Sequence, residues 1–136
     1  TAGLDPVVRR DVLELLQRVT VDDDGKSVII SSHITDDIER IADTVTYLID
    51  GRIALDGAKD DLLENWKRIH YREGMLDVGV AAKLLMVERN MFGSSGVTRD
   101  YRAIQDSLKD RVSRDEVRVE NMGLDDILIT FVRGGV

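Results

Sequence analysis

Cysteine is absent from the 136-residue sequence, proline occurs once, and only six residues are aromatic (one Trp, three Tyr and two Phe). Without cysteine, the chain has no disulfide, no thiolate ligand for a metal and no cysteine nucleophile. Its two histidines, His33 and His70, are too few to build a histidine-rich metal site. The lack of cysteine fits a reducing compartment such as the cytosol.

Long apolar runs are missing as well. A transmembrane helix needs roughly 20 consecutive apolar residues, whereas the longest candidate, residues 78–87, is short and contains Lys83. No basic segment followed by an apolar one comes after Thr1, so the sequence predicts no signal peptide. Together with an apolar content of 43%, these absences are typical of a soluble globular protein.

The chain also lacks a positive net charge, since its formal charge is −7. A nucleic-acid-binding protein needs a basic face that displaces counterions, so we expect no nucleic-acid partner. The charge is uneven: residues 1–65 hold 7 Lys or Arg against 15 Asp or Glu, a net charge of −8, while residues 66–136 hold 12 against 11, a net charge of +1. This shift indicates two parts, unless the acids simply gather in surface loops such as residues 22–24.

The first predicted element is a helix over residues 6–20. Asp5 is a good N-cap, and Pro6 suits the first helical position because its missing N–H would have no partner there. Apolar residues recur at helical spacing after it and form one apolar stripe. The residues of this stripe are Val8, Val12, Leu15, Leu16 and Val19.

A short buried strand is predicted at residues 28–30, which are β-branched and apolar and stop at Ser31-Ser32-His33. Further along, Asp50-Gly51 lies between two strand-like runs, which is a strong hairpin signal. The order of helix, strand, helix and hairpin is α/β in character. The remaining elements expected before residue 66 are a helix over residues 35–43, hairpin strands at residues 45–49 and 52–55 closed by Asp56-Gly57, and a short helix around residues 62–66.

The second half of the chain predicts a small α+β module. His70 lies in one of its strand-like runs and is expected at the surface or half-buried. Residues 116–120 alternate apolar and polar side chains, as a half-buried strand does. The other elements expected here are strands at residues 68–72 and 82–91, a turn or loop at residues 93–96, and helices over residues 98–112 and 124–131.

Three stretches of the first half follow one another in a recognisable order. They are residues 1–6 (Thr-Ala-Gly-Leu-Asp-Pro), residues 29–33 (Ile-Ile-Ser-Ser-His), and residues 36–57, which start Asp-Asp-Ile-Glu-Arg and end with the hairpin. Together they resemble the D-loop, the strand ending in the switch histidine, and the following helix and hairpin of ATP-binding cassette (ABC) transporter ATPases. The resemblance covers residues 1–65. It implies an α/β fold, the C-terminal part of a P-loop ABC ATPase domain.

By this resemblance, His33 is the switch histidine, which contacts the γ-phosphate of ATP. A histidine just past the carboxyl end of a buried strand also lies where α/β sheets place ligand-binding groups. Phosphoryl transfer depends mainly on positioning and charge stabilisation, which an imidazole hydrogen bond can supply. From the residues alone, a capped loop histidine is the alternative interpretation.

Asp5 and Gly3 have both a structural and a functional interpretation. Asp-Pro is sufficiently explained by helix capping, and Gly3 would let the backbone turn tightly before the helix. The resemblance adds that the D-loop crosses the interface of an ATPase dimer and shapes the site of the partner subunit. Both interpretations of Asp5 can hold at once.

Several parts of the family's nucleotide site are missing from the sequence. There is no G-x-x-x-x-G-K-[ST] loop, no signature sequence, no glutamine loop and no Walker B Asp-Glu pair. We therefore expect a fragment of a longer ATPase, with most ligands of ATP and Mg²⁺ outside it. We expect these 136 residues alone neither to hydrolyse ATP nor to bind it tightly, and to self-associate or be partly disordered before Lys26 because apolar faces are left uncovered.

Residues 66–136 resemble the small accessory domain that follows the ATPase core in exporter-type subunits. Their closing residues 121–129 are similar to the end of that domain, with Leu128 where an aromatic residue is frequent. The resemblance implies an export ATPase that forms a homodimer, binds membrane-spanning permease subunits and lies at the cytoplasmic face of the membrane. The alternative is a non-catalytic ligand-sensing or dimerising regulatory module. An ATPase of a soluble process such as DNA repair or translation fits the tail less well.

Overall fold

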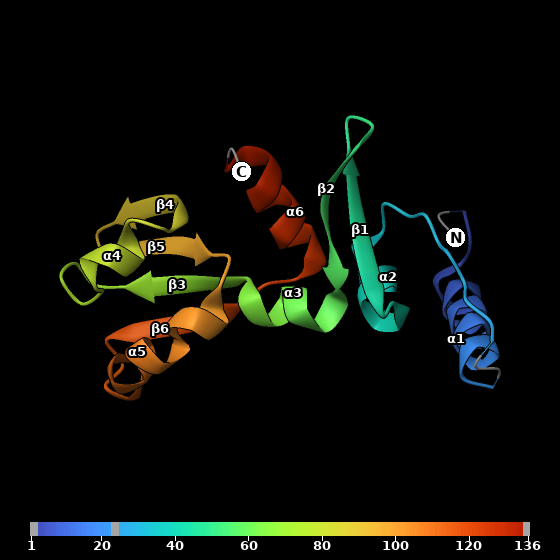
Figure 1. Ribbon diagram of the computed structural model, residues 1–136, viewed down its shortest axis with the longest axis horizontal. Coiled ribbons are helices and arrows are strands. Elements are labelled where there is room, and N and C mark those ends of the chain that lie inside the picture. The colour runs from blue at the N-terminus through green and yellow to red at the C-terminus, as the bar shows by residue number, and fades with distance from the viewer. Residues whose placement is uncertain (1–2, 23–24, 135–136) are drawn as a thin grey trace.

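The computed structural model describes residues 3–22 and 25–134 (Figure 1). Residues 1 and 2 of the D-loop-like stretch and Asp23 and Asp24 of the acidic turn lie outside the described residues. The helices are α1 (Pro6–Asp22), α2 (Thr35–Ile41), α3 (Lys59–Asn65), α4 (Val78–Ala81), α5 (Tyr101–Ser113) and α6 (Leu124–Arg133). The strands are β1 (Thr44–Ile49), β2 (Arg52–Ala58), β3 (Lys67–Tyr71), β4 (Leu85–Asn90), β5 (Gly93–Thr98) and β6 (Val117–Asn121).

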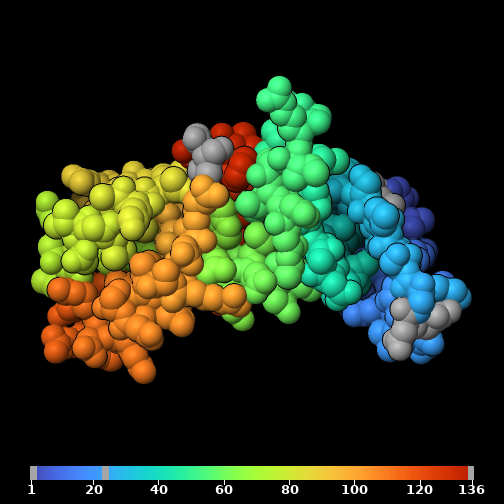
Figure 2. All heavy atoms as spheres, viewed as in Figure 1, coloured from blue at the N-terminus to red at the C-terminus, as the bar shows by residue number. Residues whose placement is uncertain are grey.

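The elements are strung out along one long axis. Helix α1 lies at one end, the β1–β2 hairpin lies in the middle, and a second sheet with α4 and α5 forms the other end (Figure 1). The tip of the hairpin projects from the surface (Figure 2). Among the described helices, none combines the length and the apolar character that a membrane span requires.

Helix α1 begins where the sequence predicts. Asp5 Oδ1 accepts a hydrogen bond from the Val7 backbone N–H at 2.8 Å, which is N-cap geometry. The helix ends at Asp22, two residues beyond the predicted end. Only part of the predicted apolar stripe packs, since Leu16 is half-buried whereas Leu15 is 59% exposed. Leu13, which lies outside the stripe, is the buried side chain of this helix and is 2% exposed.

The predicted strand at residues 28–30 is wrong. Residues 26–32 follow α1 as an irregular segment without ladder hydrogen bonds, and Ile29 is 97% exposed. A buried strand needs neighbours on both edges and cover on both faces, and the described residues place no strand beside this segment. The apolar β-branched sequence therefore cannot form a ladder with the part of the chain that the structure shows.

The hairpin prediction is confirmed. Asp50 and Gly51 both have positive φ angles, 50° and 74°, as the two-residue turns that match strand twist require. Val45 and Tyr47 face the core from β1, and a bulge follows Tyr47. Strand β2 continues to Ala58, so Asp56-Gly57 lies inside the strand instead of closing it.

The second sheet is antiparallel with strand order β4-β5-β3-β6. Here the predicted turn or loop at residues 93–96 is wrong, because these residues belong to β5 and pair with strands on both sides. A Cβ on Gly96 would lie 2.9 Å from Leu84 Cβ, so the glycine allows close packing against the sheet. The turn itself is at residues 91–92. Pairing and packing override the low strand propensity of glycine and serine.

The other predicted elements form within a few residues of their predicted positions. Their ends differ by up to three residues, as at residues 82–91, where β4 begins only at Leu85, and the short helix α4 was not predicted. The strict alternation predicted for residues 116–120 is confirmed, since Val117 of β6 faces the core and Arg118 is exposed.

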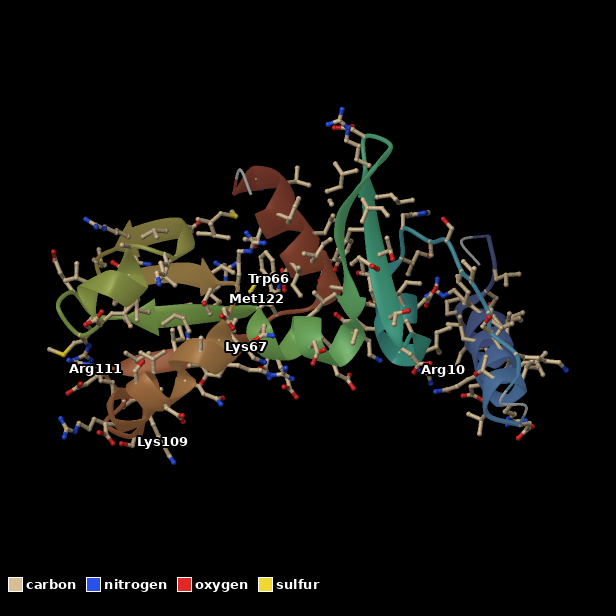
Figure 3. The ribbon with its side chains drawn as sticks, viewed as in Figure 1. Arg10, Trp66, Lys67, Lys109, Arg111 and Met122 are labelled. Carbon is tan, nitrogen blue, oxygen red and sulfur yellow. The ribbon has the colours of Figure 1, made fainter. Side chains whose placement is uncertain are left out.

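Two apolar clusters hold the elements together. One face of the second sheet packs on α4 and α5 around Ile69 and Leu108. The other cluster joins the hairpin, α6 and one end of the sheet, with Trp66 and Met122 at the junction (Figure 3). Its members are Val45, Tyr47, Trp66, Val97, Met122, Leu124 and Ile127. Residues from both predicted parts, 1–65 and 66–136, thus share one core, while the division into two domains stays a prediction.

Candidate functional site

Asp5 and Gly3 lie at the start of α1, on the surface. Asp5 is exposed and caps the helix, and its backbone C=O accepts a hydrogen bond from the Arg9 N–H at 2.8 Å. Gly3 is exposed too, and a Cβ there would meet no atom within 4 Å. Gly3 is part of a turn that precedes α1. In this structure the position has room for other residues.

His33 lies between the irregular segment and α2, and its side chain is exposed. Ser32 Oγ accepts a hydrogen bond from the Ile34 backbone N–H at 3.0 Å, a local turn that encloses His33. The helix follows two residues after His33, so α2 and this turn fix where the imidazole is presented. An exposed imidazole presented in this way is accessible to a phosphate oxygen.

An ion pair connects the segment of Asp5 with the segment of His33. Arg9 Nε of α1 lies 3.3 Å from Asp37 Oδ1 of α2, and Asp37 is only 6% exposed. Arg9 and Leu13 are one helical turn apart, so the ion pair and the buried leucine lie on the same side of α1. Asp37 Oδ2 is buried without a hydrogen-bond partner among the described residues. The sequence offered one hint of this role, an acidic residue in the first turn of a helix.

A second set of contacts joins α2 to α6, and sequence reasoning missed it. The Glu39 carboxylate accepts a hydrogen bond from the Leu124 backbone N–H at the start of α6. The Tyr47 hydroxyl donates to the Leu124 C=O at 2.6 Å, and Lys59 Nζ donates to the Glu39 C=O at 2.7 Å. Burial raises the pKa of Tyr47, and the nearby carboxylates of Glu39 and Asp125 raise it further. No local sequence signal pairs residues this far apart.

The site residues fit a nucleotide site only in part. No hydrogen bond or ion pair connects His33 with Asp5 or Gly3 within residues 3–22 and 25–134. Nor do these residues contain a group of three or more His, Asp or Glu side chains that could hold a metal ion. The described residues therefore supply one candidate phosphate contact, His33, and do not fit Mg²⁺.

Comparison with curated proteins identifies relatives of one kind. A putative ABC transporter ATP-binding protein of Listeria monocytogenes serotype 4b (strain F2365) is 42% identical over 57 residues, 42% of this chain and 20% of the relative. A phosphonates import ATP-binding protein of Thiobacillus denitrificans (strain ATCC 25259 / T1) is 34% identical over 77 residues, 56% of this chain and 29% of the relative. No family model matches the sequence.

A longer match has a lower sequence identity. A putative ABC transporter ATP-binding protein of Streptococcus pneumoniae serotype 4 (strain ATCC BAA-334 / TIGR4) is 25% identical over 120 residues, 88% of this chain and 20% of the relative. The chain thus spans between about a fifth and three tenths of the length of these relatives. Relatives named for a direction of transport are import proteins, so the expected export type is not supported. Over part of its length, the chain is homologous to the ATP-binding proteins of ABC transporters.

Proposed function

We propose that this chain is the D-loop and switch-histidine part of an ATP-binding subunit that drives transport across a membrane. The observation that carries the proposal is that Asp5 and His33 are both exposed and lie just before α1 and α2, two helices joined by the Arg9–Asp37 ion pair. One rigid unit then presents both residues to solvent, where a nucleotide and a second subunit can reach them. The regulatory-module alternative does not account for the matches to ATP-binding proteins.

In the proposed mechanism, His33 donates an imidazole N–H to a γ-phosphate oxygen and stabilises its charge during hydrolysis. ATP supplies the phosphoanhydride bond whose hydrolysis drives transport. The Ser32–Ile34 hydrogen bond and α2 order the backbone on both sides of His33, so the imidazole is presented from an ordered segment when phosphate arrives. Asp5 Oδ1 is already bonded to the Val7 N–H, which leaves the second carboxylate oxygen for the partner subunit of a homodimer.

The uncovered apolar surface of the first half supports a larger assembly. Val7, Leu15 and Ile29 are 69%, 59% and 97% exposed. Apolar side chains gathered on one surface mark a contact with further protein. We infer that other parts of the ATP-binding subunit cover this surface, and that permease subunits hold the assembled ATPase at the cytoplasmic face of the membrane. ATP and Mg²⁺ would then be bound mostly by residues outside this chain, so the chain alone binds ATP weakly.

The test is a His33→Ala substitution in the complete ATP-binding subunit, with steady-state ATPase activity and nucleotide affinity measured separately. Removing one pre-positioned donor to the transition state lowers kcat by roughly 10²–10³-fold. His70→Ala is the matched control, because His70 lies in β3 and pairs with Glu120 instead. Wild-type kcat in the His33→Ala variant, or an equal loss in both variants, would contradict the proposed role of His33.

A further inference from the structure

The second sheet has one covered face and one face that is largely open. Directly opposite residues of antiparallel strands project from the same face, so His70 shares a face with Ser95 and Arg118. The alternate residues of β3, such as Ile69, point to the other face, where α4 and α5 cover them. Figure 1 shows these two helices gathered on the sheet, while α6 lies at the sheet's end beside the hairpin.

The open face is hollowed into a groove with a volume of about 710 Å³. Among the described residues, α6 covers this face at the end where Val97 is buried. The groove lies on the rest of the face. Polar side chains form the groove, and one apolar ring, Phe92, lies at its edge with 84% of its surface exposed. The groove therefore combines polar side chains with the exposed ring of Phe92.

Three arginines, Arg68, Arg72 and Arg118, line the groove. No hydrogen bond or ion pair engages their guanidinium groups within the part of the chain that the structure describes. The hydrogen bond from His70 lowers the pKa of Glu120, and the charges of His70, Arg68 and Arg118 lower it further. Arg68 lies opposite Glu120, and Arg118 lies opposite His70, on the paired strands β3 and β6.

The carboxylates nearby balance this positive charge, although none of them is hydrogen-bonded to the three arginines among the described residues. Glu120 lies 2.5 Å from His70 Nε2, and Glu116 lies 3.3 Å from Arg111 Nη1, so both already have partners. Glu88 and Asp115 remain at the groove against the three arginines. With His counted as neutral, Glu88, Asp115 and Glu120 equal the three arginines in charge. An anion is therefore attracted here by guanidinium N–H donors that have no partner among the described residues, and not by an excess of positive charge.

The donor set fits phosphate. A guanidinium group presents a planar fork of N–H donors that matches two oxygens of a phosphate, and it stays charged at every physiological pH. Ser95 of β5, which lies opposite His70 on the same face, adds a hydroxyl group to this groove. A phosphate group carries several oxygen acceptors that point in different directions. It can therefore accept hydrogen bonds from donors on more than one strand at once. The ring of Phe92 is placed to pack against an apolar part of the same ligand.

We propose that this groove binds a small phosphate ester, with Arg68 and Arg118 holding the phosphate and Phe92 packing against a flat organic group. The inference concerns residues 66–136 and does not depend on the proposed role of His33. Arg72, at the end of β3, adds a third cation at the mouth of the groove. Phosphate esters with a ring are therefore preferred to inorganic phosphate.

The experiment is a nuclear magnetic resonance titration of the 136-residue chain with phenyl phosphate, inorganic phosphate and phenol. We expect saturable shifts of the Ser94 and Ser95 amide signals with phenyl phosphate, weaker binding of inorganic phosphate, and none of phenol. An R68Q/R118Q variant should raise the Kd for phenyl phosphate by at least about tenfold, because two charge-assisted contacts are lost. Phe92→Ala should reduce the affinity for phenyl phosphate and leave that for inorganic phosphate unchanged.

The matched control is R10Q/R52Q, which removes the same charge from exposed arginines elsewhere. Figure 3 places Arg10 on α1, at the opposite end of the molecule from Arg111 beside the groove. The control should change the Kd by less than about twofold, since exposed charges beyond a Debye length are screened. The single variant Arg72→Gln should also raise the Kd, by less than the double variant does. A rise in this variant would show that the effect of R68Q/R118Q does not come from a folding defect. Equal losses in control and groove variants, or no saturable shift in the wild type, would show that the groove is only a solvated sheet face.

Discussion

At the scale of single residues, Tyr47 fastens the hairpin to α6. Its hydroxyl donates to the Leu124 C=O at 2.6 Å from inside the apolar core, between the two predicted parts of the chain. A buried hydrogen bond of this kind contributes about 1 kcal/mol net, because folding exchanges it for one to water. The Leu124 N–H also donates a hydrogen bond to the Glu39 carboxylate, so both backbone groups of Leu124 are bonded to the hairpin side of the core.

A Tyr47→Phe substitution should lower the free energy of unfolding by about 1 kcal/mol at neutral pH, measured by urea denaturation. Tyr71→Phe is the control, because Tyr71 packs against the other apolar cluster at the sheet's covered face. We expect its change to stay within about 0.5 kcal/mol. A loss that is equal in both variants would show that the Tyr47 hydrogen bond adds no stability of its own.

The pKa of Tyr47 also determines how the stability of the protein changes at alkaline pH. Burial, with help from Glu39 and Asp125, raises the pKa of Tyr47 above the ordinary value of about 10. Because the folded state then holds this proton more tightly than the unfolded state, stability is full below the unfolded pKa and falls as pH rises above it. In Tyr47→Phe this part of the alkaline loss should disappear. An unchanged slope would contradict the environment described for Tyr47.

At the scale of elements, local sequence signals succeeded where they require no distant partner. Asp5-Pro6 marks a helix start and Asp50-Gly51 marks a hairpin turn, and both form as predicted because a few neighbouring residues determine them. Two predictions were wrong in opposite ways: residues 28–30 were predicted as a strand and are irregular, whereas residues 93–96 were predicted as a turn or loop and form a strand. The first is apolar but has no neighbouring strand among the described residues, and the second is rich in glycine and serine but lies between two strands.

The site shows the same division. Exposure of Asp5 and His33 could be expected from loop positions at helix starts, but the Arg9–Asp37 and Glu39–Leu124 contacts could not. These pairs join residues that are 28 and 85 positions apart, and no periodic pattern within one element encodes such a distance. The roles of His33 and Asp5 themselves stay predictions.

Gly96 tests how far packing determines β5. A methyl group there would lie 2.9 Å from Leu84 Cβ and 3.2 Å from Val87 Cγ2, so the neighbouring side chains must move. We expect Gly96→Ala to destabilise the chain by about 1–3 kcal/mol, measured as a lower urea midpoint. Gly57→Ala is the control, because its nearest neighbour, Leu62 Cδ2, is 4.0 Å away and leaves room for the methyl group. Equal stability of the Gly96 and Gly57 variants would show that β5 can shift without cost.

At the scale of the whole molecule, apolar surface is unevenly distributed between the two ends. At the sheet end, Ile69, Leu108 and other core side chains are enclosed by helices. At the other end of the molecule (Figure 1), α1 contacts α2 through one side, and Val8, Leu15 and Val19 of its apolar stripe are exposed. Such a surface favours a contact that covers it, either in a complete ATPase or with a second copy of this chain.

We therefore expect the 136-residue chain to self-associate through α1 and the irregular segment after it. Leu15→Glu introduces a charge at a site that is 59% exposed, so it should weaken association without disturbing the packed side of the helix. Sedimentation equilibrium should then show a Kd for association at least about tenfold higher, the equivalent of 1.4 kcal/mol. Val78→Glu, at an 83% exposed site on α4, makes the same chemical change at the opposite end and should leave association unchanged. If the wild-type chain is a monomer at all concentrations, the apolar side of α1 is too small to drive contact by itself. If Val78→Glu weakens association as much as Leu15→Glu, added negative charge is the cause, and the contact does not lie on α1.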